Sequence, residues 1–411
     1  MMNNAPETQE FENPWRDRSA LPTVELKYRV IAAIACFVCA LAIPMAFDEL
    51  VAPFLTAALF AAVVFFARTR KNVLLPLISA VILSLLLGVS GAAIFLSAVL
   101  GTALTAYLIT VQPRGYACAV LPLLALAAAY LWTRDLWISL LALSFLPAAI
   151  LLAVATLAGK RRTTAICFAL GGWLITALIM LAVVLYRIYG KLDAEVIQTS
   201  IDALRAWFVQ QMMPLREIFA AVQEVEADAQ NEWMGELYRL AATPEAWNQL
   251  VTQVFQILLG VTPALIAVCC GIIAFEAQSF LNATYQRTGL SDVLTLEATA
   301  FTMSVTAAVL YGLSFLLTLT VPESSMASVV MQNLSLMLMP GFCVIGVRDI
   351  AQAFARARGN TRVLLILLFA AFFCCGASGS ILYLLAMWGA YGTLTRMLRR
   401  KLMDKMQDAN Q

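Results

Sequence analysis

The sequence contains no histidine, so the commonest general base and the commonest metal ligand of proteins are both absent. It also contains no Walker phosphate-binding loop, no serine–histidine–aspartate set and no long basic stripe of the kind that binds nucleic acid. Paired carboxylates are missing from the middle of the apolar runs. We therefore expect no catalytic residues, no metal and no cofactor, and an enzyme is the least favoured class, with serine, lysine or tyrosine chemistry left open.

Charged residues are also scarce. They make up 13% of the 411 residues, whereas hydrophobic residues make up 62%. A soluble domain has about 25% charged and roughly 45–50% apolar residues. Many windows of about 20 residues carry no charge, and they do not alternate as the strands of a β-barrel would. The sequence predicts an all-α fold, a polytopic transmembrane helix bundle.

The nine cysteines do not indicate a disulfide framework, because all of them lie inside apolar runs. Structural disulfides belong to exposed domains in oxidising compartments. We interpret the cysteines as small hydrophobic residues. They are Cys36, Cys39, Cys118, Cys167, Cys269, Cys270, Cys343, Cys374 and Cys375.

The apolar runs define the expected spans. They cover residues 30–47, 51–67, 73–88, 91–111, 116–132, 136–157, 164–186, 251–275, 298–321, 326–347 and 363–395. Residues 88–91 read Gly-Val-Ser-Gly, a turn signal that separates two of these runs. Basic clusters flank both ends of the last run, which favours a hairpin that turns near residues 375–379. The expected number is about 12 spans, or 11 if the last run crosses once.

Lysine and arginine positions predict the orientation, because short loops rich in these residues stay on the cytoplasmic side. The expected organisation begins with a cytoplasmic tail (1–29) and an N-terminal bundle of seven transmembrane helices (30–186). An extracytoplasmic amphipathic segment (187–250) separates it from a C-terminal bundle of about five transmembrane helices (251–395). A basic cytoplasmic tail (396–411) follows, so both termini are expected in the cytoplasm.

The segment 187–250 is the only long polar stretch between runs. Its apolar residues recur at helical spacing, with a break expected near Pro214. Thr243 and Pro244 predict the start of a helix that continues into the span at residue 251. The segment is interpreted as amphipathic helices on the outer membrane face or packed on the loops, with a lid or a partner-docking surface as the alternative.

Ionisable residues of the C-terminal runs are expected at cytoplasmic ends, where Glu276, Glu297, Arg348 and Asp349 would face lipid headgroups. Uncharged polar residues next to prolines are the better candidates for a site, because a helix broken at proline exposes carbonyls that can bind a solute. The speculative substrate-binding residues are Gln253, Gln256, Pro263, Gln332, Asn333 and Pro340. The alternative is that these amides hold helices together.

The C-terminal half, about residues 251–400, resembles the YybS-like predicted bacterial membrane proteins. The resemblance depends on the proline-containing stretch 258–265, the segment 282–289 with its asparagine, arginine and glycine, and the span from Asn333 to Gly346. It implies a multi-pass protein of the bacterial cytoplasmic membrane, distantly similar to substrate-binding components of transporters. The N-terminal runs do not follow the pattern, and the family has no established reaction.

Two functions follow from these features. The first is a transport-type protein, a permease or its membrane-embedded substrate-binding component, which would take an unknown small solute. The second is a non-catalytic membrane scaffold that docks partner proteins through residues 187–250 or the basic tail. The expected partners are the lipid bilayer and either that solute or a membrane protein, with no nucleic acid.

Overall fold

The computed structural model describes residues 24–46, 48, 50–67, 70–112, 118, 120–223, 239–241, 243–290, 301–322, 325–356 and 378–409. Within these ranges every regular element is a helix and no strand occurs, which confirms the all-α prediction. Cys36 and Cys39 are buried as small residues of the hydrophobic core.

The N-terminal half follows the apolar runs closely. Its elements are α1 (Leu26–Met45), α2 (Ala52–Phe66), α3 (Arg70–Val111), α4 (Val120–Thr133), α5 (Leu136–Ser139), the 3-10 helix η3 (Leu140–Leu143), α6 (Leu146–Leu157) and α7 (Arg162–Tyr189). Helix α3 contains two of the predicted runs. Gly88 interrupts it with φ 75° and ψ −180°, which only glycine adopts readily, so the predicted separation between these runs is confirmed.

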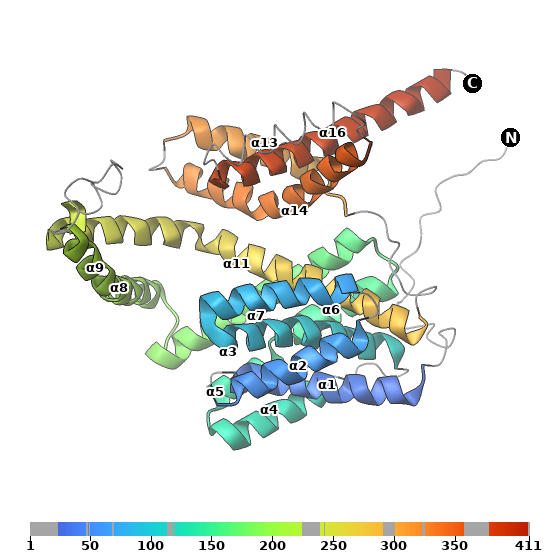
Figure 1. Ribbon diagram of the computed structural model, residues 1–411, viewed down its shortest axis with the longest axis horizontal. Coiled ribbons are helices and arrows are strands. Elements are labelled where there is room, and N and C mark those ends of the chain that lie inside the picture. The colour runs from blue at the N-terminus through green and yellow to red at the C-terminus, as the bar shows by residue number, and fades with distance from the viewer. Residues whose placement is uncertain are drawn as a thin grey trace. The chain divides into compact units, whose positions relative to one another are not determined.

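The described residues of the C-terminal half form six helices. These are α8 (Ala194–Gln211), α9 (Met213–Gln223), α11 (Pro244–Thr288), α13 (Val305–Thr320), α14 (Met326–Arg356) and α16 (Ser378–Ala409). Helix α11 starts at Pro244 as predicted, and it runs on to Thr288, well beyond the expected end of the span at residue 275 (Figure 1). Its 45 residues make it about 67 Å long at roughly 1.5 Å per residue.

Among the described residues, six helices are long and apolar enough to cross a membrane, judged by length and composition. They are Leu26–Met45, Leu87–Val111, Leu136–Leu157, Arg162–Tyr189, Pro244–Thr288 and Met326–Ala355. Shorter apolar helices occupy Ala52–Phe66, Pro76–Leu85, Val120–Thr133 and Val305–Thr318. The described helices are therefore compatible, in length and composition, with a membrane protein.

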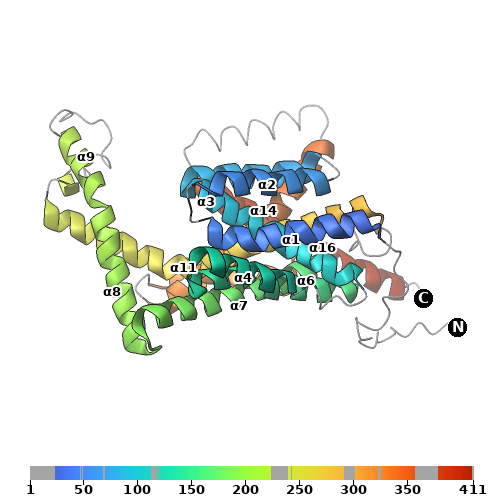
Figure 2. The ribbon, with the colours of Figure 1, turned by 90° about the horizontal axis from the view of Figure 1, so that it is seen from below.

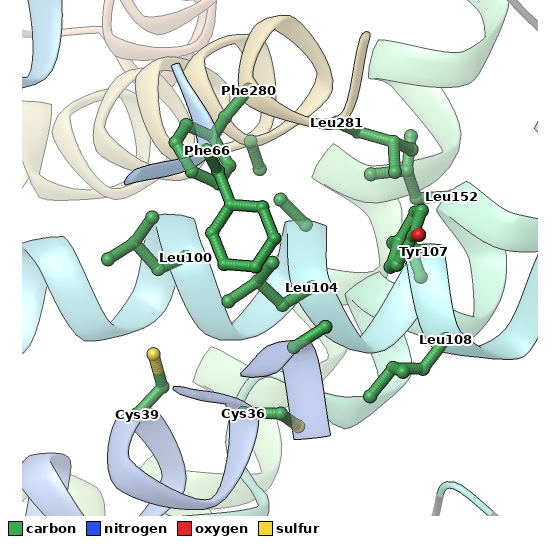
Figure 3. Packing of buried hydrophobic residues seen from close by; sticks show 14 of the residues in the cluster. Cys36, Cys39, Phe66, Leu100, Leu104, Tyr107, Leu108, Leu152, Phe280 and Leu281 are labelled. Atoms are coloured by element: carbon green, nitrogen blue, oxygen red, sulfur yellow. The ribbon is translucent and has the colours of Figure 1, made fainter. Parts of the chain in front are cut away.

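The chain divides into two compact units. The first comprises Met1–Met180, Ile266–Leu313 and Leu338–Gln411, and the second comprises Leu181–Leu265 and Ser314–Met337. In the first unit, the segment Leu87–Val111 is the most enclosed candidate span, with 94% of its apolar window buried. Leu100 and Leu104 of this segment lie beside Phe66 in the main hydrophobic core, which also contains Phe280 and Leu281 (Figure 3).

The second unit has a small core of its own. Helices α8 and α9 follow one another with a break at Met212, close to the predicted position, and the start of α11 crosses their junction (Figure 2). Phe208 of α8 lies 5.7 Å from Phe255 between ring centroids, and Phe219 of α9 lies 6.1 Å from Trp247. The apolar residues around the junction of α8 and α9 therefore pack on the first turns of α11.

Helices α14 and α16 lie side by side and run in the same direction (Figure 1). Cys343 contacts the carbonyl of Leu382, and six residues further on Asp349 binds Arg396. This direction places both C-terminal ends at the same side. The hairpin stays a prediction, because its first arm and most of its turn, residues 363–377, lie outside the described residues.

Candidate functional site

The second half of α11 is buried although it is polar. From Ala274 to Tyr285, neighbours from α2, α3 and α7 contact different sides of the helix. Its fully buried side chains include Glu276, Gln278 and Thr284. A helix that is enclosed on all sides is normally hydrophobic all round. The sequence did not indicate this segment as a candidate site, because its polar residues are typical of a cytoplasmic loop.

Glu276 is the most unusual member of this segment. Glu276 is 3% exposed, and its Oε1 accepts a hydrogen bond of 2.6 Å from Ser79 Oγ of α3. The other oxygen, Oε2, has no hydrogen-bond partner among the described residues. The prediction that Glu276 faces lipid headgroups is wrong, because α3 covers the side chain.

Aromatic rings occur further along the Glu276 side of α11. Phe280, one turn further along, lies 6.3 Å from Phe66 between ring centroids, and the two rings are adjacent in Figure 3. Two turns beyond Phe280, the Arg287 guanidinium lies 5.7 Å from the centroid of Phe65. The Glu276 carboxyl itself is buried, and an unpaired charge in a buried position is strongly disfavoured.

Arg162, the first residue of α7, binds the side of α11 that carries Gln278 and Ser279. Its Nε donates to Gln278 Oε1 at 2.8 Å, and its NH2 group donates to Ser279 Oγ at 2.9 Å. The guanidinium also lies 5.3 Å from the ring centroid of Phe275. Within the described ranges no carboxylate forms an ion pair with Arg162, so its charge is held by neutral partners.

The same side of α11 offers polar atoms without partners. Gln278 and Asn282 are one turn apart, and their side chains therefore share a face. Gln278 Nε2 and Asn282 Oδ1 are buried and form no hydrogen bond with any described residue. Close by along the helix, Tyr285 shares a hydrogen bond of 2.9 Å with Thr110 of α3. Donor and acceptor groups are thus both available inside the bundle.

Two of the six predicted substrate-binding residues, Asn333 and Pro263, come together. Asn333 Nδ2 donates to Gly260 O at 2.6 Å, and Asn333 Oδ1 accepts from the Ala264 N–H at 3.0 Å. Asn333 Nδ2 also donates to Val329 O at 2.8 Å, which occupies both hydrogens of the amide. These are the bonds of the alternative interpretation, in which an amide joins two helices.

The remaining predicted residues lie elsewhere. Gln253, Gln256 and Gln332 are exposed, and Pro340 lies within α14. The expected helix breaks at Pro263 and Pro340 are wrong, because α11 and α14 continue through both prolines. In α11 the Asn333 amide supports the backbone next to the proline, which explains why the helix persists there. A substrate-binding role for the six residues stays a prediction.

Asp349, also expected at a cytoplasmic end, is the centre of a second polar cluster. Both of its carboxylate oxygens accept from Arg396 NH1, at 2.9 and 2.7 Å. Arg348 donates to Asp349 Oδ1 at 3.2 Å and to the Phe301 carbonyl at 2.9 Å. All these charges are paired, so the cluster joins α14 to α16 and leaves no free group for chemistry. Glu297 lies outside the described residues.

No family model, no curated protein and no solved structure matches this chain.

Proposed function

We propose that the chain is a transport-type membrane protein, a permease or its membrane-embedded substrate-binding component, for a small polar solute. The observation that carries this proposal is the buried polar segment of α11, with its unpartnered atoms on Glu276, Gln278 and Asn282. Buried polar atoms almost always have partners, and an exception calls for water or a ligand. Ionisable residues inside membrane bundles mark solute and ion paths.

The chemistry of the segment defines the class of solute. Gln278 Nε2 is a donor and Asn282 Oδ1 is an acceptor, and both lie on the face that Arg162 reaches. A small molecule with at least one hydrogen-bond donor and one acceptor would satisfy both groups. An apolar solute would leave them unpaired, which costs about 1–3 kcal/mol for each group.

The proposal includes the location of the chain. We propose a multi-pass protein of the bacterial cytoplasmic membrane with about 12 spans and both termini in the cytoplasm. The parallel direction of α14 and α16 supports it, because Arg348 and Arg396 then lie at the same side as the basic tail. In that arrangement the shorter apolar helices among the described residues would also cross the membrane, in addition to the six long ones.

The test is solute entry into liposomes that contain the purified protein. Stopped-flow light scattering would follow re-swelling in a panel of small solutes with and without hydrogen-bonding groups. We expect faster entry of at least one polar solute than in protein-free liposomes, and loss of that entry in Asn282→Leu. Gln286→Leu is the matched control, since Gln286 is an exposed amide on the same helix. Equal entry with and without protein, or an unaffected Asn282→Leu, would contradict the proposal.

A membrane scaffold is the second candidate, and one feature of α8 favours it. Ile197, Leu204 and Trp207 form a stripe along this helix, and all three are exposed. Such a stripe could pack on a partner protein, as amphipathic helices do. Crosslinking in cells would separate the two functions. A protein partner that is lost on deletion of residues 193–240, together with unchanged solute entry, would favour the scaffold.

A further inference from the structure

We propose that the carboxyl group of Glu276, held by the Ser79 hydroxyl, is a proton-binding site whose proton is the coupling ion of transport. The coupling rests on the proposed transport function, whereas proton binding itself does not. The side chain is buried, and Ser79 occupies only one of its two oxygens. Protonation forms one O–H bond at Oε2 and neutralises the carboxylate, with the proton supplied by water and returned to it. No electron transfer or further reactant is needed.

The geometry favours a proton over a metal cation. Hard cations take about six or more oxygen ligands. Around Glu276 the described residues provide the two carboxylate oxygens and the Ser79 hydroxyl, next to the Phe66 and Phe280 rings. No group of three or more histidine, cysteine, aspartate or glutamate side chains occurs in the described part of the chain. A proton needs only the free lone pair of Oε2.

The groups near Glu276 come from several elements, and both neutral and charged groups are among them. From α3 the facing group is the neutral Ser79 hydroxyl, and from α2 it is the Phe66 ring beside Phe280. From α7, Arg162 binds Gln278 and Ser279, and Ser279 lies about 60° around the helix from Glu276 at roughly 100° per residue.

The remaining basic groups lie toward the end of α11. Arg287 lies on the face of Glu276 but three turns away, over the Phe65 ring. From α1, Arg29 has a buried Nε without a described partner. None of these cations forms an ion pair with Glu276, since the recorded bonds of that carboxyl go to Ser79 alone.

Loss of the proton would therefore place an uncompensated negative charge in the bundle, on the same helix as Gln278 and Asn282. Both amides belong to the proposed solute site and lie within about two turns of Glu276. Proton release at Glu276 and solute binding at these amides therefore act on the same segment of α11. Two ligands that bias the same element affect each other's binding reciprocally.

The test begins with infrared difference spectroscopy of the purified protein in lipid nanodiscs, titrated with acid. The carbonyl stretch of a protonated, water-excluded carboxylic acid should appear in the wild type and be absent in Glu276→Gln. In Ser79→Ala the band should shift in frequency, because the carboxyl loses its hydrogen bond. Glu245→Gln, which changes an exposed carboxyl at the start of the same helix, is the control and should keep the band unchanged. If Glu276→Gln fails to fold, the frequency shift of the band in Ser79→Ala still tests whether the proton is bound at Glu276.

Two results would overturn the proton site. One is a band that is identical in the wild type, Glu276→Gln and Ser79→Ala. The other is a titration midpoint that moves when sodium replaces potassium, which would indicate a metal cation at the carboxyl.

Coupling is read separately in the liposomes. An imposed pH gradient should accelerate solute entry in the wild type and leave Glu276→Gln at its gradient-free rate. If the infrared band behaves as expected but no solute enters in any condition, the proton site stands and the transport function falls. If solute enters equally with and without the gradient, transport stands and the coupling falls.

Discussion

The side-chain amide of Asn333 binds both Gly260 O and the Ala264 N–H, the two backbone groups of α11 that flank Pro263. In a regular helix these two groups bond to each other, because each N–H donates to the carbonyl four residues earlier. Pro263 has no N–H and crowds the preceding turn, which weakens the helix at this level. Asn333 therefore acts as a bridge inside the second unit that keeps α11 helical across its proline.

The first prediction concerns this bridge. Asn333→Ala should lower the free energy of unfolding by about 1–2 kcal/mol, in the upper range for hydrogen bonds between membrane helices. Thermal unfolding in detergent would measure the change. The neighbouring exposed amide provides the control, and Gln332→Ala should leave the midpoint unchanged.

A double-mutant cycle sharpens this test. Pro263→Ala restores an N–H that can donate to the Leu259 carbonyl and removes the ring that crowds the preceding turn, so Asn333→Ala should be less damaging in that background. Additive effects of the two substitutions would show that Asn333 supports the fold independently of the proline.

The second prediction uses two adjacent glycines of α7. A Cβ at Gly172 would collide with the backbone of Ala148, whereas a Cβ at Gly171 would meet nothing within 4 Å. Gly172→Ala should destabilise the protein by about 1–3 kcal/mol through overpacking. Gly171→Ala should stabilise it by roughly 0.5–1 kcal/mol, because alanine loses less backbone entropy in a helix. Similar shifts of the unfolding midpoint in both variants would argue against the close approach of α6 and α7.

The third prediction concerns the Asp349–Arg396 pair. The Asp349 side chain is 13% exposed, and a Cβ at Gly392 would lie 2.5 Å from its Oδ2, so the absence of a side chain there makes room for the carboxylate. Asp349→Ala should cost about 1–3 kcal/mol, as expected for lost hydrogen bonds to charged groups. The exposed pair Asp202–Arg205 is the comparison, and Asp202→Ala should cost no more than about 0.5 kcal/mol. Equal losses in chemical denaturation would mean that solvent screens the Asp349 pair as well.

The fourth prediction concerns pH and the start of α8. The hydrogen bond from Lys191 and then the Val196 N–H hold the pKa of Asp193 below its usual range, and Asp193 in turn raises the pKa of Lys191. Because the folded pKa of Asp193 is lowered, its support of α8 is present above the unfolded pKa and disappears as the pH falls through the folded value. The support from Lys191 disappears only as the pH rises through its raised folded pKa.

Hydrogen exchange measures this effect. After correction for the intrinsic pH dependence of exchange, the first amides of α8 should be most protected near neutral pH and lose protection in acid. Asp193→Ala should remove the acid-dependent change. Thr199→Ala, further along the same helix, should retain it. A wild-type profile that is flat in acid would contradict the capping role of Asp193.

The fifth prediction tests the orientation. Single cysteines in place of Thr199 and Met403 would be introduced on a background without native cysteines, and both positions are exposed. A membrane-impermeant thiol reagent on intact cells should modify position 199 and spare 403, because short loops with basic clusters resist translocation. The reverse pattern would invert the proposed topology. Modification of both would mean that residues 363–395 cross the membrane once.

The sequence by itself determined the features that depend on local composition. The scarcity of charge and the lack of alternation predicted an all-helical chain with apolar helices long enough for a membrane. Gly88 and Pro244 marked a kink and a helix start correctly, because glycine at positive φ and proline in the first turn act through the local backbone.

Only the tertiary structure decided which polar groups matter. Ser79 and Glu276 are 197 residues apart, and no local pattern shows that the first covers the second. Likewise, Asn333 bonds to a backbone 69 residues earlier in the chain, so the helix persists through Pro263 where local rules predict a break. Burial and pairing depend on which helices become neighbours, and this choice depends on packing over the whole chain rather than on the residues of one segment.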